Sequence, residues 1–123
     1  MRIDLAVSET RMPQIQSITE IGSGFSERTD PAALVIGPTG VGLSPGCEEE
    51  GDGCVLYIAD SLNNRIGAIF NPLRRRHSAG TGLTVSSGGS LNDPLGLTVA
   101  PNGHILVVNG DDGFITEITP GGK

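Results

Sequence analysis

Apolar residues fill most positions between residues 55 and 60, and turn-forming residues follow directly. The sequence Val55-Leu-Tyr-Ile-Ala-Asp60 places apolar side chains on both faces of an extended segment, which is typical of a strand buried on both sides. Asn63 and Asn64 come next, and asparagine favours turns because it tolerates left-handed backbone angles and bonds nearby amides. The pattern predicts a buried strand, a tight turn and a second strand from Arg65.

A second segment of the chain repeats this arrangement. Gly40 and Gly96 lie 56 positions apart, each in a Pro-x-Gly sequence, whereas Asp60 and Asn109 lie 49 positions apart. The difference of seven positions is a loop in the first copy that holds both cysteines. Both copies predict the order strand, turn, strand, turn, strand, with a period of about 50 residues.

Composition narrows the fold class. The 123 residues include 19 glycines and 8 prolines, which favour short strands joined by many turns, so we expect an all-β fold. No stretch of about 18 apolar residues is present, and the N-terminal residues lack the apolar core of a signal peptide. We therefore expect no membrane span; if the protein is exported, its signal lies outside this chain.

The segment Tyr57-Ile-Ala-Asp-Ser-Leu-Asn-Asn-Arg-Ile66, preceded by Pro38-Thr-Gly-Val-Gly-Leu43, resembles the NHL repeat. That repeat has a Pro-x-Gly start and a Tyr-Val-Ala-Asp-x-x-Asn-Asn-Arg-Ile core. The second copy departs from the pattern, because Asn109 replaces the aspartate and the Asn-Arg pair is missing. The resemblance extends over the chain from about residue 20 onward. In this part the chain is also similar to uncharacterised bacterial NHL-repeat proteins. It implies a β-propeller, in which four-stranded antiparallel blades stack around an axis.

The resemblance further implies that residues 1–123 form a single partial propeller unit, with one complete blade between two incomplete ones. The complete blade spans residues 35–87, with strands at 39–44, 55–61, 65–71 and 82–86. Residues 1–24 would supply two outer strands of a preceding blade, at 2–7 and 16–21. Residues 93–123 would supply the first three strands of the next blade, at 95–100, 105–109 and 114–119.

These strands do not close a ring, so we expect uncovered sheet faces and edges that need a partner. The remainder of the propeller could come from a longer chain or from other copies of this one. NHL propellers commonly have about six blades, and a homotrimer would supply six. Each junction would then hold three strands from one copy and two from the next, one more than a blade needs.

Cys47 and Cys54 bracket the acidic sequence Glu48-Glu-Glu-Gly-Asp-Gly53. If the flanking segments pair as a hairpin, the sulfurs come close enough for a disulfide, provided that the Cα atoms lie within about 7 Å. Two free thiols in a reducing compartment are the alternative, and the spacing excludes a zinc site. A disulfide would favour an extracytoplasmic location, periplasmic or secreted.

The candidate structural residues of the first turn are Asp60, Asn63, Asn64 and Arg65. A charge-assisted bond between Asp60 and Arg65, or from Arg65 to a neighbouring blade, would hold the turn in place. The alternative is that these residues lie on a propeller surface where ligands dock. We favour the structural interpretation.

Charge argues against nucleic-acid binding, because the chain carries a net charge of −6 and a single basic cluster, Arg74-Arg-Arg76. For that cluster we favour a solvated loop over a phosphate site. Two acidic groups carry the oxygen ligands that calcium prefers, but neither matches an EF-hand loop, so we expect solvated turns. These groups are Glu48, Glu49, Glu50 and Asp52 in one, and Asn109, Asp111 and Asp112 in the other.

No nucleophile and base arrangement is visible around His77 or His104. We therefore expect a noncatalytic scaffold, without cofactor, catalytic residues or metal ligands of its own, that binds a protein, a peptide or a small ligand. The alternative is a fragment of an enzymatic propeller, a lyase or hydrolase with a metal at the axis, whose ligands would come from several blades.

Overall fold

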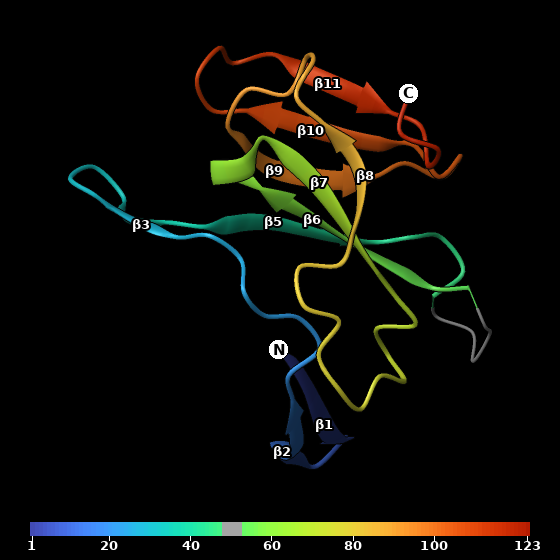
Figure 1. Ribbon diagram of the computed structural model, residues 1–123. Coiled ribbons are helices and arrows are strands. Elements are labelled where there is room, and N and C mark those ends of the chain that lie inside the picture. The colour runs from blue at the N-terminus through green and yellow to red at the C-terminus, as the bar shows by residue number, and fades with distance from the viewer. Residues whose placement is uncertain (48–52) are drawn as a thin grey trace.

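The structure, a computed structural model, describes residues 1–47 and 53–123 (Figure 1). Within these ranges the chain is built from β-strands and contains no α-helix, so the all-β prediction is confirmed. One short 3₁₀ segment is present, η1 at Ser61–Asn63. The strands form four small antiparallel sheets, none of which closes on itself.

The first copy of the repeat forms a four-stranded sheet, which we call sheet 1. Its strands are β5 (Pro38–Leu43), β6 (Val55–Asp60), β7 (Arg65–Phe70) and β8 (Leu83–Ser87), and neighbours in the chain are neighbours in the sheet. The turn between β6 and β7 is η1 followed by Asn64, whose φ of 45° is left-handed. Asparagine tolerates that conformation better than most residues, which is the physical reason for the tight turn here.

The second copy forms a three-stranded sheet, which we call sheet 2. It consists of β9 (Pro94–Val99), β10 (Ile105–Asn109) and β11 (Ile115–Ile118), with β10 in the middle. Gly103, at a φ of 85°, closes the turn between β9 and β10, where its amide bonds the Ala100 carbonyl at 2.8 Å.

The two sheets share one register. Leu56 pairs with Leu43 and Ile69 in sheet 1, and Ile105, 49 positions later, pairs with Val99 and Ile118 in sheet 2. The next pairs also correspond, since Val41 lies opposite Ile58 and Leu97 lies opposite Val107. Residues directly opposite each other share a face of an antiparallel sheet, so each face of sheet 1 has an equivalent face in sheet 2.

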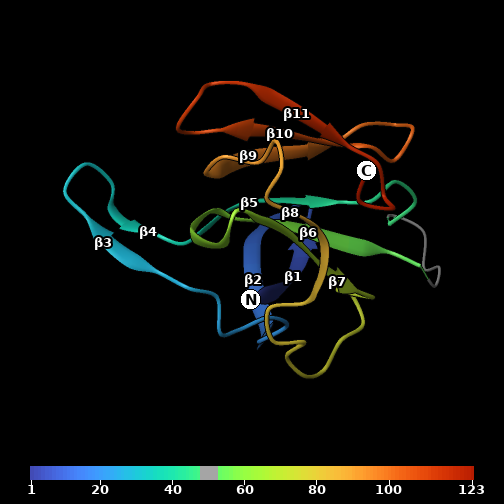
Figure 2. The ribbon, with the colours of Figure 1, turned by 45° about the horizontal axis from the view of Figure 1, so that its top comes forward.

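Sheet 2 lies on one face of sheet 1 as a second layer (Figures 1 and 2). We call the face of sheet 1 that carries Tyr57 and Ala59 its front, and the opposite face, which carries Leu56 and Ile58, its back. The back of sheet 2 is the face that carries Ile105 and Val107, the counterparts of Leu56 and Ile58. The main buried cluster joins the front of sheet 1 to this face. From sheet 1 it takes Val55, Tyr57, Ala59, Ile66 and Ala68, and from sheet 2 it takes Ile105, Val107 and Ile118, with Leu91 from the connection between the sheets.

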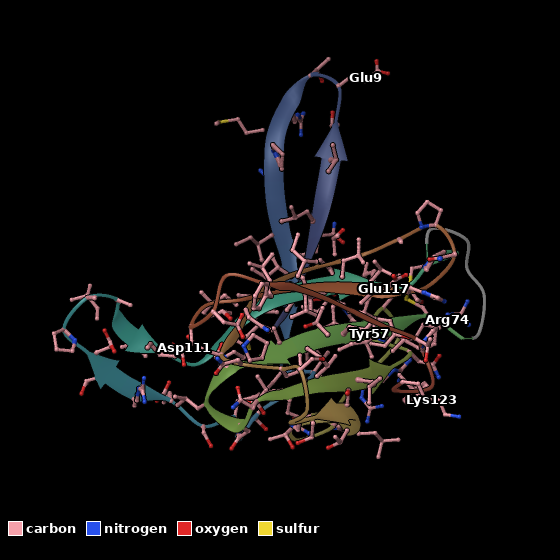
Figure 3. All side chains as sticks on the ribbon, turned by 90° about the horizontal axis from the view of Figure 1, so that it is seen from above. Glu9, Tyr57, Arg74, Asp111, Glu117 and Lys123 are labelled. Carbon is pink, nitrogen blue, oxygen red and sulfur yellow. A yellow bond between two sulfur atoms is a disulfide. The ribbon has the colours of Figure 1, made fainter. Side chains whose placement is uncertain are left out.

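Two hairpins lie outside these layers. The first consists of β1 (Arg2–Ser8) and β2 (Arg11–Thr19), and it projects from the body with Glu9 at its tip (Figure 3). The second, β3 (Arg28–Asp30) with β4 (Leu34–Ile36), was not expected from the sequence. Asp30 forms its turn by accepting bonds from the amides of Ala32 and Ala33 at 2.8 and 3.3 Å.

The strand expected at residues 16–21 is placed differently. In the structure β2 begins at Arg11 and ends at Thr19, so Ile21 lies outside it. The Ile21 carbonyl instead accepts a bond from the Ala79 amide at 3.0 Å, and the Ile21 side chain is buried. Tertiary contact with the loop before β8 thus ends the strand two residues early.

Candidate functional site

Asp60 stands at the end of β6 with its side chain fully buried. Arg65, the first residue of β7, approaches it with Nε and Nη2 both at 3.0 Å from Oδ2. Asn63 donates from Nδ2 to the other carboxylate oxygen at 2.9 Å. The buried carboxylate is thereby bonded on both oxygens by residues of its own turn.

The Arg65 guanidinium also bonds the neighbouring strand β8 and the loop that leads into it. It donates to the Thr81 carbonyl at 2.9 Å and to the Thr84 hydroxyl at 3.1 Å, and it lies 6.0 Å from the centre of the Phe25 ring. Asn64 ties the same turn to the next connection, since its Oδ1 accepts a bond from the Asp93 amide at 2.7 Å. These contacts link the turn to β8 and to the start of sheet 2, which is the geometry of a structural clasp.

The back of sheet 1 forms one wall of an open apolar groove of about 640 Å³. The wall carries the apolar residues of three strands, Val41, Leu43, Leu56, Ile58 and Ile69. Ile21, Gly22 and Phe25 cover the Ile58 and Ile69 end, while Met1 and Arg2 at the base of the first hairpin form another part of the lining.

Burial on the back is therefore uneven. Ile58 and Ile69 are buried, Leu56 is half-buried, and Val41 is 63% exposed. The sequence predicted a β6 strand buried on both faces, and that holds for Ile58 but not fully for Leu56. The pattern could not show how much of the back the N-terminal segment covers.

Arg2 holds the first hairpin against the groove. Its Nη1 donates to three carbonyl oxygens of the loop after β7, those of Pro72, Leu73 and Arg75, at 3.2, 2.8 and 2.9 Å. Its Nε lies 3.0 Å from the Asp4 carboxylate. The Ser17 hydroxyl and Arg2 together lower the pKa of Asp4, the hydroxyl bond being the larger cause.

The basic cluster lies in the loop after β7, where Arg74, Arg75, Arg76 and His77 line a smaller groove of about 320 Å³ together with Asn71. Arg75 bonds its own loop, since it donates to the Phe70 and His77 carbonyls at 3.2 Å each. That use of Arg75 fits a loop that is stabilised by its own cation.

The acidic candidates divide into two cases. Residues 48–52 lie outside the described part of the chain. Asp112 accepts bonds from the Phe114 amide at 2.9 Å and from the side chains of Asn92 and Asn109, and the Phe114 bond is the largest cause of its lowered pKa. Asp111 is exposed beside it. Within residues 1–47 and 53–123, no group of three or more His, Cys, Asp or Glu is placed to hold a metal ion.

His77, His104 and Asn109 do not contact one another in the described part of the chain. His104 Nδ1 is 2.7 Å from Glu117 Oε1 across β10 and β11. Asn109, the counterpart of Asp60, is buried; its Nδ2 donates to the Ser90 carbonyl at 2.8 Å, and its Oδ1 finds no partner among the described residues. His77 lies in the basic loop, so the two histidines occupy different elements.

Cys47 and Cys54 form a disulfide whose Cα atoms are 4.9 Å apart, just beyond the paired ends of β5 and β6. Ser44 supports it, since its hydroxyl lies 3.4 Å from the Cys47 sulfur and accepts the Val55 amide at 3.0 Å. Disulfides persist in oxidising compartments. Among the described residues no helix is long and apolar enough to cross a membrane.

The structure thus brings Asp60, Asn63 and Arg65 into one cluster and brings Asn109 into contact with Asp112, while His77 and His104 lie in separate parts of the chain. The apolar groove was not predicted. Its sequence signal is the alternation Gly40-Val-Gly-Leu43, which puts glycine on one face of β5 and large apolar residues on the other. Comparison with protein-family models, curated proteins and solved structures finds no match for this chain.

Proposed function

We propose that this chain is part of an NHL-type β-propeller and serves as a noncatalytic scaffold that binds a protein, a peptide or a small ligand on a face of the completed ring. One observation carries the proposal. Two units with the same strand order and register stack with the front of one on the back of the other. Such head-to-tail stacking of corresponding units is how propeller blades are arranged.

The use of the polar residues supports a structural role for this chain. Asp60 and Arg65 bond each other and the neighbouring strand, and Arg75 bonds its own loop. Polar side chains that bond neighbouring strands and loops hold those loops in place. Scaffold proteins commonly bind their partners through loops that a rigid framework positions. The remaining units would come from a longer chain or from further copies, three copies giving six units.

The disulfide supports an extracytoplasmic setting for this scaffold. In such a compartment the 47–54 bridge would close the loop between β5 and β6 permanently. Mass spectrometry of the native protein, alkylated without reduction, tests this: the peptides that hold Cys47 and Cys54 should be recovered linked, and recovery of both as alkylated thiols would contradict it.

A binding assay and a metal analysis together test the proposed function. The assembled protein, dialysed free of loosely bound ions, is applied to an immobilised panel of unrelated peptides and measured by surface plasmon resonance. We expect saturable binding to a subset of the panel, with less than one tightly bound metal ion per ring by elemental mass spectrometry. A stoichiometric ion together with hydrolase or lyase turnover would contradict the scaffold and favour the enzymatic propeller.

A further inference from the structure

The interface between the two sheets is heterologous, because it joins a front to a back. Equivalent surfaces therefore remain unused at each end of the stack. One is the back of sheet 1, which is the apolar groove. The other is the front of sheet 2, and a heterologous interface repeated between chains generates rings or open filaments.

The unused back matches the used one position by position. Val41, Leu43 and Leu56 of the groove correspond to Leu97, Val99 and Ile105, which pack in the main cluster. Val41 is 63% exposed and Leu43 is 43% exposed, although both are large apolar residues. The groove thus presents the same kind of surface that sheet 2 buries against sheet 1.

The front of sheet 2 is also exposed and partly apolar. Val108 and Ile115, the counterparts of Ala59 and Ile66, are 45% and 69% exposed, whereas Ala59 and Ile66 are fully buried. Glu117 adds one carboxylate to this face. Among the described residues that line the groove, Arg2 is the charged one and none is Asp or Glu. The carboxylate of the sheet 2 front would therefore meet no like charge in the groove.

Glycine at position 96 gives an independent indication. A Cβ built on its counterpart Gly40 would lie 2.5 Å from the Leu95 carbonyl oxygen and 2.8 Å from the Leu97 nitrogen, so sheet stacking requires glycine there. A Cβ on Gly96 would meet none of the described residues within 4 Å, and Gly96 has no positive φ that would require glycine. No contact among residues 1–47 and 53–123 requires this glycine, but a backbone stacked on it would.

We propose that a second copy of this chain docks head to tail, with the front of its sheet 2 seated on the back of sheet 1. This rests on the proposed propeller stacking and names the partner of the groove. The contacts follow from the ones within the chain. Gly96 of one copy lies against the backbone of residues 39–41 of the next. Thr98, the counterpart of Gly42, faces Val41 and Leu43, and those two side chains shift to admit it, because even a Cβ on Gly42 would lie 2.7 Å from the Leu97 side chain.

The docked copy also meets the base of the first hairpin, because Met1 and Arg2 border the groove. The apolar face of that hairpin is exposed, with Leu5 and Ile15 at 52% and 62%. An isolated two-stranded hairpin is marginally stable in water. A second copy beside it gives this apolar face a covering surface.

The test is the solution mass of the full chain, measured by light scattering. A protein concentration of about 100 µM is used, because an interface with a dissociation constant of about 1 µM would then be almost fully occupied. We expect a mass of at least twice the 12.7 kDa of one chain. Val41→Asp should reduce it to 12.7 kDa, because a carboxylate would be buried in the interface. Val35 in β4 lies away from the groove and is 56% exposed, close to the 63% of Val41, so Val35→Asp is the matched control and should leave the assembly intact.

Gly96→Ala should raise the dissociation constant about tenfold or more, since the added methyl group overpacks the proposed interface and touches none of the described residues of its own chain. Mixing the Val41→Asp and Gly96→Ala variants should restore a dimer, because each keeps one intact surface and the two are complementary. A wild-type mass of 12.7 kDa, or an assembly unaffected by both variants, would overturn the proposal.

Gly40→Ala separates this proposal from the one on which it rests. If the stack within the chain is correct, the added methyl group collides with β9 and lowers the melting temperature. An unchanged melting temperature would overturn both proposals. A lowered melting temperature with a monomeric wild type would overturn only the second copy and leave the propeller scaffold to be completed by other units.

Discussion

Replacing Arg65 with alanine tests whether the turn cluster is a structural element. The Asp60 side chain has no exposed surface, and that of Arg65 is 12% exposed. The change removes the only cation within bonding distance of Asp60 among the described residues and leaves the Asn63 amide as its remaining side-chain partner. Removing one partner of a buried ion pair costs about 3–5 kcal/mol because the other charge stays buried.

We expect Arg65→Ala to lower the free energy of unfolding by about 3 kcal/mol, the lower end of that range, since the Arg65 side chain keeps 12% of its surface exposed. Urea denaturation followed by circular dichroism measures it, under conditions that keep the disulfide intact. Arg65→Lys should recover part of the loss: it keeps the charge but loses the planar fork that also bonds Thr81 and Thr84.

Arg28 provides the matched control. It is 61% exposed and lies 3.9 Å from Asp30, so Arg28→Ala removes a surface ion pair and should change stability by about 0.5 kcal/mol or less. If Arg65→Ala costs no more than Arg28→Ala, the cluster does not hold the fold. Unchanged stability with lost ligand binding would assign these residues to a binding surface instead.

Other measurements test separate parts of the structure. Replacing both Cys47 and Cys54 with alanine should lower the free energy of unfolding by about 2–3 kcal/mol, because the bridge closes a loop with a sequence separation of 7; equal urea midpoints with and without the bridge would refute this. The Asp112 carboxyl should titrate below the ordinary aspartate range in an NMR titration, because the Phe114 amide bonds its charged form. The lowered pKa of Asp112 stabilises the folded protein at pH values above the pKa of an unfolded aspartate, and this stabilisation is lost as the pH falls through the folded-state pKa. Asp112→Asn should therefore reduce the loss of stability on acidification. An unchanged dependence of stability on acid pH would contradict this.

The strands of sheets 1 and 2 were predictable because each carries several apolar residues between strong turn signals. Asn64 and Gly103 mark turns by backbone conformation, which is a local property that sequence reveals. The β3–β4 hairpin was missed because strands of three residues carry too little pattern to be told from a loop. Its turn signal was the Asp30-Pro31 pair, because the Asp30 side chain accepts hydrogen bonds from the amides of Ala32 and Ala33, which follow that pair.

The candidate site was predictable only where it is local. Asp60 and Arg65 lie five residues apart around one turn, so their ion pair follows from the hairpin. The groove combines Ile21 and Phe25 with the back of β5 and β6, and the sequence does not show which segments far apart in the chain meet there. Alternation predicts two faces for a strand but does not say which face a distant segment covers.

Sheet 1 and sheet 2 stack front to back, and we propose that further copies continue this stack around an axis; a crystal structure of the purified chain would show it. We expect a ring in which the front of each sheet 2 covers Val41 and Leu43 of a neighbouring copy, with Gly96 against the backbone of residues 39–41. A structure in which sheet 1 and sheet 2 do not stack through Tyr57 and Val107 would contradict the propeller stacking, and one in which the groove stays open to solvent would contradict the docking of a second copy.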